Sequence, residues 1–292
     1  SQDVYDAVYL QLGLDKPLIQ QYLIYLSDIT RGDFGTSIMT TRPVLDDIIR
    51  FFPATLELAT IATFFGVILG IPMGVLAAVN QGRLIDHVIR IIGLFGYSVP
   101  IFWLGMVALL VFYAALGWLP GPGRIEVYYD GIVEARSGII LIDSALQGEW
   151  EIFWNALHHL VLPSAMLATF ALAYIARMTR SFMLDQLNQE YILTARVKGL
   201  SESAVIWRHA FRNVLVQLIT IIGLTYASLL EGSVLTETIF AWPGIGQYIT
   251  TSLFNADMNA VIGGTVVVGF CFVGINVLSD ILYRIADPRA RE

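Results

Sequence analysis

The sequence is poor in charge and almost lacks cysteine. Charged residues make up 14% of its 292 residues, whereas soluble domains carry about 25%. The single cysteine, Cys271, excludes an intrachain disulfide. Apolar residues make up 56% of the chain, against about 45–50% in soluble domains. A composition this apolar and this poor in charge predicts a membrane protein.

Motifs for nucleotide binding and for common hydrolytic chemistry are also missing. The sequence has no GxxxxGK[ST] loop, no HExxH or GxSxG motif and no pair of catalytic carboxylates. The adjacent His158 and His159 point about 100° apart on a helix, and no other His or Cys clusters with them. We therefore expect no catalytic residue, cofactor or metal site in this chain. If ATP drives the protein, another chain binds the ATP and its Mg²⁺.

Five apolar segments are long enough to cross a bilayer. A spanning helix needs about 20 predominantly apolar residues, and the segments that qualify cover residues 53–79, 88–116, 156–184, 214–235 and 259–285. The sequence therefore predicts an all-α polytopic membrane protein. An odd number of spans places the two ends of the chain on opposite sides of the membrane.

The distribution of charge predicts the orientation. Most Lys and Arg residues lie in the loops around 80–90 and 177–212 and in the C-terminal tail, whereas the opposite side carries most of the acidic residues. Basic loops are cytoplasmic by the positive-inside rule, so the C-terminus is expected inside and Ser1 outside. The net charge of −7 comes from the outer loops, and no nucleic-acid partner is expected.

The start of the chain predicts one more helix. About 50 residues would have to be exported, yet neither a signal sequence nor an initiator Met precedes Ser1. We expect a further transmembrane helix upstream of Ser1, which would make six spans in total.

A polar, basic segment, QEYILTARVKGLSESAVIWRHAFRN, lies between two of the spans at 189–213. Residues 190–198 are expected to form a short helix, Gly199 a turn with positive φ, and Ser201 the cap of the next helix. Two short helices at an angle would form a knob that fits a cleft in a soluble ATPase. The alternative is an amphipathic hairpin whose Arg and Lys side chains contact lipid phosphates.

A second motif, ETIFAWPGIGQ, follows the fourth span at 237–247. Its Pro and Gly residues break regular structure, while Phe240 and Trp242 are expected at the depth of the membrane interface that aromatic residues favour. Irregular backbone at membrane depth is tolerated only against protein or water. This favours a re-entrant segment at the outer mouth of a pathway over a simple aromatic anchor.

Three further features concern the spans themselves. Pro100 is expected to kink the second span, beside Tyr97 and Ser98, either as part of a solute pathway or as a packing kink. Three glycines spaced by four in the first span predict a close helix contact, within this chain or with a partner. Two carboxylates near span ends, Glu57 and Asp280, are interpreted as structural groups that reach headgroups or pair with Arg.

These motifs together resemble the permease subunits of ATP-binding-cassette (ABC) importers, in the dipeptide/oligopeptide/nickel permease family. The 189–213 segment is similar to that family's conserved cytoplasmic loop, with Thr194, Ala195 and Gly199 at the small-residue and glycine positions. Leu193 stands where many permeases have Glu, and Arg212-Asn213 replaces a Leu-Pro ending; both departures are typical of the peptide-permease version. The 237–247 motif resembles the family signature ETIFxWPGxG, and LGLDKPLIQQYLIYL and ARMTRSFML resemble dipeptide permeases.

The resemblance implies a type I ABC importer permease fold in a bacterial or archaeal cytoplasmic membrane. It implies a homologous second permease subunit, two ATPase subunits and an extracytoplasmic solute-binding protein as partners, with membrane lipid around the helices. Di- or oligopeptides are the expected solute; glutathione, nickel chelates or oligosaccharides are alternatives, and an ATP-independent secondary carrier is the rival class.

The expected organisation and site residues follow from this resemblance. The chain divides into an extracytoplasmic segment, a membrane domain and a cytoplasmic tail at residues 1–50, 51–286 and 287–292, with a coupling loop at 186–213 and an outer re-entrant segment at 236–258. Coupling to the ATPase is assigned to Glu190, Thr194, Ala195, Arg196, Lys198, Gly199, Leu200, His209, Arg212 and Asn213. The outer gate and pathway are assigned to Glu237, Phe240, Trp242, Pro243, Gly244, Gly246, Tyr97, Ser98 and Pro100.

Overall fold

A computed structural model describes residues 15–286, and no β-strand occurs within them. The all-α prediction is confirmed. The first 14 residues of the predicted N-terminal segment and the predicted tail at 287–292 lie outside the described residues. The longer elements are α2 (Leu18–Thr30), α3 (Val44–Val79), α4 (Leu84–Ser98), α7 (Trp150–Leu187), α9 (Phe211–Gly232) and α12 (Met258–Ala286). The shorter ones are α5 (Ile101–Ala108), η1 (Leu109–Ala115), η2 (Val127–Tyr129), α6 (Ile140–Gln147), α8 (Glu190–Val197), η3 (Ala204–Ala210), α10 (Val234–Ile239) and α11 (Ile245–Phe254).

Four helices in the described part of the chain are long and apolar enough to cross a membrane: α3, α7, η3 together with α9, and α12. They match four of the five predicted spans. Their bounds extend beyond the apolar runs, with α3 beginning at Val44 and α7 at Trp150. Polar residues next to an apolar run do not break a helix, so composition alone places the helix ends too far inward.

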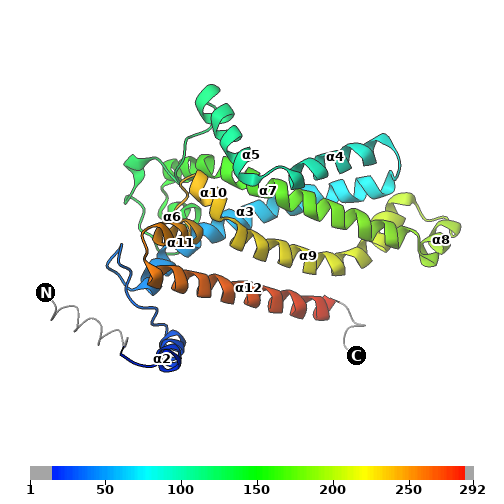
Figure 1. The fold of residues 1–292 in the computed structure, drawn as a ribbon. Helices are drawn as coiled ribbons and strands as arrows, with labels where there is room; N and C mark the ends of the chain where they lie inside the picture. The colour runs from blue at the N-terminus through cyan, green and yellow to red at the C-terminus, as the bar shows by residue number, and fades with distance from the viewer. Residues whose placement is uncertain (1–14, 287–292) are drawn as a thin grey trace.

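The second predicted span is broken rather than kinked. Helix α4 ends at Ser98, Val99 is extended, and α5 begins at Ile101, so that the two halves meet at 97°. A proline disfavours the helical region for the residue before it, and Val99 takes the extended conformation, whereas the residues before Pro53, Pro72 and Pro163 stay helical. As a result α5 and η1 project from the side of the bundle (Figure 1).

The glycine stripe of α3 packs against α7. A Cβ added at Gly66 would lie 2.6 Å from the Cβ of Ala171, and one at Gly74 would lie 2.5 Å from the Cβ of Thr179. The close contact predicted from the spacing of these glycines is therefore made within this chain. It brings the backbones of the two longest helices together.

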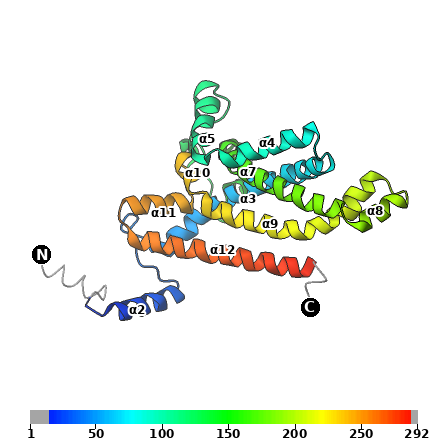
Figure 2. The ribbon, with the colours of Figure 1, turned by 45° about the vertical axis from the view of Figure 1, so that its right-hand side comes forward.

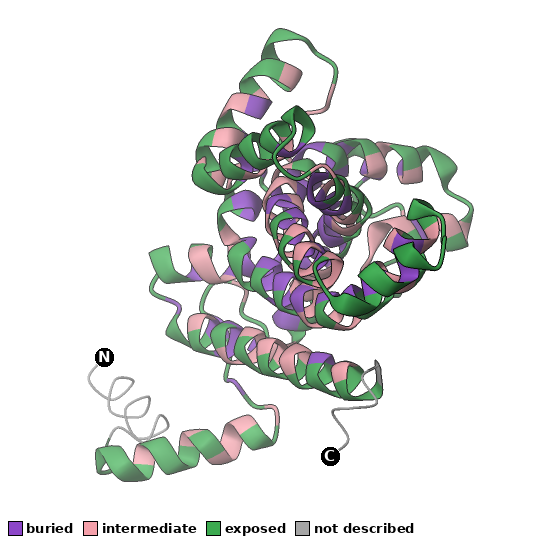
Figure 3. Ribbon diagram, turned by 90° about the vertical axis from the view of Figure 1, so that its right-hand side faces the viewer, coloured by how far each residue is buried: buried purple, intermediate pink, exposed green. Residues whose placement is uncertain are grey.

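Helix α7 lies in the middle of the bundle, and α12 lies along one side (Figures 1 and 2). Within the apolar window of each helix, 61% of α7 is buried but only 11% of α12. Buried residues accordingly gather at the centre of the molecule, while α2 and α12 are mainly exposed (Figure 3). The apolar surface of α12 is left for lipid or for another protein chain to cover.

Candidate functional sites at the two ends of the bundle

At one end of the bundle, helix α8 ends in a tight turn. Gly199 has φ of +79°, as predicted, and its N–H donates to the Arg196 carbonyl (2.9 Å). The Leu200 N–H reaches back to the Ala195 carbonyl (3.3 Å), which completes a Schellman motif. The Ser201 hydroxyl then accepts from the Ala204 N–H (3.4 Å), as the predicted cap of the next helix.

That next helix is not a separate short one, which corrects the prediction of two short helices. Its first part, η3, has π-helical hydrogen bonding and continues directly into α9, giving one helix over Ala204–Gly232. No Gly or Pro occurs between Ser201 and Gly223 to stop it. The knob therefore consists of α8, one turn and the end of a spanning helix, so its movement is tied to that of α9.

One face of α8 packs on the bundle. Ile192 and Ala195 are buried in a cluster with Val205, Met183 and Val75. Ala195, matched above to a small-residue position, thus contacts this chain. Helix α8 packs chiefly on η3, and the cluster continues to residues of α3 and α7.

The opposite face of α8 is exposed and apolar at its tip. Leu193, Val197 and Leu200, which we call the tip, are 63%, 80% and 42% exposed. Exposed polar and basic side chains surround the tip, and Arg196 pairs with Glu202 across the turn (2.9 Å). Among the other coupling residues assigned from sequence, the exposed ones are Glu190, Thr194, Lys198, Arg212 and Asn213, and His209 is half-buried.

The opposite end of the bundle contains a buried carboxylate, Glu237 of α10. Its side chain is fully buried, and its Oε1 accepts from the hydroxyls of Thr55 (2.7 Å) and Ser233 (2.8 Å). Its Oε2 accepts from the Gln247 N–H (2.9 Å). The Thr55 hydroxyl also accepts from the Ile245 N–H (2.8 Å). Glu237 therefore ties α10, α11 and α3 to one another.

The glycines of the second motif are explained by this carboxylate. A Cβ added at Gly244 would lie 2.4 Å from Cδ of Glu237, and one at Gly246 would lie 2.8 Å from its Oε2. The φ of Gly244 is −101°, which any residue adopts. These positions are glycine because the backbone passes close to Glu237, and not only because glycine breaks regular structure.

The aromatic residues of the motif are buried inside the protein, and their depth at the membrane interface stays a prediction. Trp242 is fully buried in the main core, and its Nε1–H donates to the Ala54 carbonyl (2.9 Å). Phe240 is buried against Ala108 and Leu162. Between them, Ala241 has φ of +46°, a strained value for a residue with a Cβ. Pro243 is half-buried in the same turn.

A second buried carboxylate, Glu57, lies near the same end. It pairs with Arg124 (2.5 Å) and accepts from the Leu141 N–H (3.1 Å), and Arg124 also donates to the Gly138 carbonyl (2.9 Å). The interpretation of Glu57 as a structural group paired with Arg is confirmed. The sequence did not identify Arg124 as the partner of Glu57. The only indication was that few basic residues occur in the loop that contains Arg124. Asp280, the other such carboxylate, is exposed.

The N-terminal segment is attached to this end through Asp257. The Ser37 hydroxyl and the Met39 N–H donate to its carboxylate, at 2.6 and 3.2 Å. Burial by itself would raise the pKa of Asp257, but these hydrogen bonds outweigh it and hold the pKa below its usual value.

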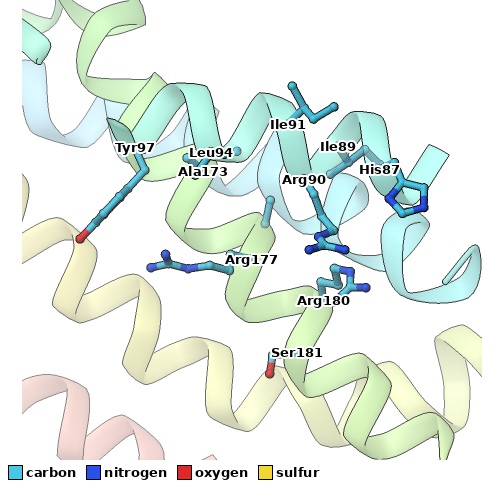
Figure 4. Close-up of a pocket in the computed structure, with 12 residues that line it drawn as sticks. His87, Ile89, Arg90, Ile91, Leu94, Tyr97, Ala173, Arg177, Arg180 and Ser181 are labelled. Atoms are coloured by element: carbon cyan, nitrogen blue, oxygen red, sulfur yellow. The ribbon is translucent and has the colours of Figure 1, made fainter. Parts of the chain in front are cut away.

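A third feature, a cleft of about 670 Å³, lies between α4 and α7 (Figure 4). Tyr97, a predicted pathway residue, lines it; Ser98 and Pro100 are exposed near the break but do not line it. Arg177 and Arg180 of α7 also line the cleft, although the sequence did not single them out as site residues.

The structure is a bundle of apolar spans. A knob projects at one end, and a buried turn joins two short helices at the other. This arrangement is that of a polytopic membrane permease. The chain belongs to the family described as binding-protein-dependent transport system inner membrane component, whose sequence model matches residues 70–292.

Its relatives include peptide permeases. The chain is 46% identical to the probable D,D-dipeptide transport system permease protein DdpB of Escherichia coli K12, over 99% of this chain and 85% of that protein. It is 44% identical to the di/tripeptide transport system permease protein DppB of Pseudomonas aeruginosa UCBPP-PA14, over 96% of this chain and 83% of that protein. A chain from the inward-facing MetNI methionine ABC transporter shares the fold, with a TM-score of 0.63 and 17% identity over 82% of this chain and 96% of that chain.

Proposed function

We propose that this chain is one of two transmembrane subunits of an ATP-driven importer that carries di- or oligopeptides across the cytoplasmic membrane. A homologous permease completes the pathway, two cytoplasmic ATPase subunits drive it, and an extracytoplasmic binding protein delivers the solute. In this arrangement α8 and the C-terminus are cytoplasmic. The identity to dipeptide and di/tripeptide permeases supports the peptide substrate.

The observation that carries the coupling role is the tip. Leu193, Val197 and Leu200 expose large apolar side chains outside any spanning segment. Apolar area in water costs roughly 25 cal/mol per Å², so such a surface favours a protein partner. Exposed basic residues around the tip, such as Lys198, match the rim of a protein interface.

The packing of α8 supplies a route for force. When the ATPases close, they push on α8, whose buried residues Ile192 and Ala195 contact the bundle. Because η3 and α9 form one helix, the push also tilts a spanning helix. Two states of the bundle that differ in their contacts with the ATPases are what alternating access requires.

The experiment changes the tip without touching the bundle. Val197→Asp with Leu200→Asp should leave the chain folded and inserted but abolish co-purification of the ATPase subunits and ATP-dependent dipeptide uptake in vesicles. The control is Val127→Asp, which is 87% exposed at the other end and should retain both. Dipeptide uptake that persists without the ATPases would support a secondary carrier instead.

Substrate class is tested by competition. Unlabelled dipeptides and tripeptides should compete for uptake of a labelled dipeptide, whereas free amino acids and oligosaccharides should not. Competition by an oligosaccharide alone would overturn the peptide assignment and leave the importer assignment intact.

A further inference from the structure

Both basic and apolar residues line the cleft between α4 and α7. His87, Arg90, Arg177 and Arg180 line it together with Ile91, Leu94 and other apolar residues. Figure 4 shows that Arg90 comes from α4 and that Arg177 and Arg180 come from α7, on the facing helix. We propose that this cleft binds the headgroup phosphate of an anionic phospholipid in the leaflet nearest α8, with an acyl chain along its apolar residues.

The charge of the cleft is only partly balanced by the protein. Asp86 accepts two hydrogen bonds from Arg180, at 2.6 and 2.8 Å, and one from the Gly82 N–H at 3.0 Å. Its side chain is 1% exposed and pairs with Arg180, and the charge of Arg90 also acts on it. Neither Arg90 nor Arg177 forms an ion pair with a carboxylate in residues 15–286. An anionic ligand would balance these two guanidinium groups.

Arg177 is held in position by aromatic rings. Its guanidinium carbon lies 5.0 Å from the ring centroid of Tyr97 and 5.4 Å from that of Tyr174, and Tyr97 in turn stacks on Phe170. Contact with a ring face leaves the N–H groups at the edge of the guanidinium available, and these bind phosphate oxygens well.

The depth of the cleft fits a headgroup. Arg177 is the first charged residue after the apolar stretch of α7, and it precedes the helix end at Leu187 by about 15 Å, at 1.5 Å per residue. Arg90 lies about 9 Å inside the start of α4 by the same measure. Both cations therefore lie near the boundary between the apolar layer and water, where basic pockets between spanning helices bind lipid headgroups.

Binding is tested on the purified protein, with the subunits that co-purify, by native mass spectrometry with added lipid. Phosphatidylglycerol and phosphatidylcholine with the same acyl chains are compared. An arginine close to an anionic headgroup contributes roughly fivefold in affinity, so the wild-type protein should prefer phosphatidylglycerol by about tenfold or more. Arg90→Gln with Arg177→Gln should reduce that preference to about twofold or less.

A matched control removes the same charge elsewhere on the same side of the membrane. Arg83→Gln with Arg284→Gln changes two residues that do not line the cleft, and the preference should persist. If both double variants lose it equally, general surface attraction explains the binding and the site is overturned. The single variant Arg90→Glu changes an exposed side chain and should by itself lower the preference for phosphatidylglycerol. It tests the site even if the double variant fails to fold.

Two soluble competitors separate the lipid from other anions. Glycerol phosphate, which has the headgroup chemistry without acyl chains, should displace phosphatidylglycerol only weakly. Displacement by glycerol phosphate at lipid-like concentrations, or by a dipeptide, would overturn the lipid assignment in favour of a free anion or the solute. The proposal does not depend on the transport function, because lipid binding is measured without ATP or uptake.

Discussion

The tip on α8 and the two buried glutamates at the other end of the bundle differ in how their side chains are covered. At α8, Val197 and other large apolar side chains point into solvent. At the other end, the carboxylates of Glu57 and Glu237 are buried, and each accepts several hydrogen bonds from this chain. The tip is left uncovered by this chain, whereas the two carboxylates have their hydrogen-bond partners within it. Changes at α8 should therefore affect coupling, and changes at the other end should affect folding.

The comparison requires that the two ends lie on opposite sides of the membrane. Single cysteines at Val127 and Val197, both more than three-quarters exposed, are introduced with Cys271 replaced by Ala. In intact cells a membrane-impermeant maleimide should label the cysteine at 127 fully and that at 197 only after the membrane is opened. The reverse pattern would contradict the orientation, and labelling of both in intact cells would contradict the separation of the two ends.

The largest effect on folding is expected at the buried ion pair. Arg124→Met leaves the Glu57 carboxylate buried without its partner, which costs about 3–5 kcal/mol. The loss is measured as a lower melting temperature in detergent. Glu57→Met combined with Arg124→Met should recover most of it, because the uncompensated charge is gone. Arg136→Met, at an exposed pair, serves as the control and should melt like the wild type.

A smaller effect on folding is expected at Gly244. The new Cβ of Gly244→Ala would lie 2.4 Å from Cδ of Glu237, and that side chain is held by three or more hydrogen bonds. Overpacking of this kind costs about 1–3 kcal/mol. Gly232→Ala, where nothing lies within 4 Å of the new Cβ, is the matched control. Equal melting temperatures for the two variants would show that α10 and α11 shift to accommodate the new Cβ and are not fixed by Glu237.

The contrast between the ends also marks what the sequence predicts well. A bilayer imposes length and composition on a helix, so the spans follow from the sequence. The positive φ of the turn at Gly199 and the cap at Ser201 follow as well, because both depend on neighbouring residues only. At the α8 end the turn and the cap were therefore predictable, whereas the continuation of η3 into α9 was not.

Features set by distant contacts were not predictable in the same way. Arg124 lies 67 positions from Glu57, and no local pattern joins them. That Pro100 breaks its span, with a turn of 97°, depends on what α5 packs against. The burial of Trp242 depends on space provided by α3 and α7, whereas its aromatic character alone favoured the interface.

The smallest effect on folding, with the largest effect on coupling, is expected at Gly199. Its φ of +79° disfavours any residue with a Cβ, and no atom lies within 4 Å of an added Cβ. Gly199→Val would cost about 1–3 kcal/mol of local strain if the turn kept its conformation, but the exposed turn relieves most of this strain by distorting the tip, while the core stays intact. The melting temperature should stay near that of the wild type, but dipeptide uptake should collapse, with ATPase subunits either lost or hydrolysing ATP without transport.

Asn adopts positive φ more readily than Val does, so Gly199→Asn has the same open space and less strain and should retain most uptake. Dipeptide uptake and ATPase activity, both measured in reconstituted vesicles, distinguish loss of the ATPase subunits from ATP hydrolysis without transport. If the Val and Asn variants fail equally, any added side chain disturbs the contact with the partner, and the backbone conformation is not the cause. If both transport normally, the turn has no part in coupling.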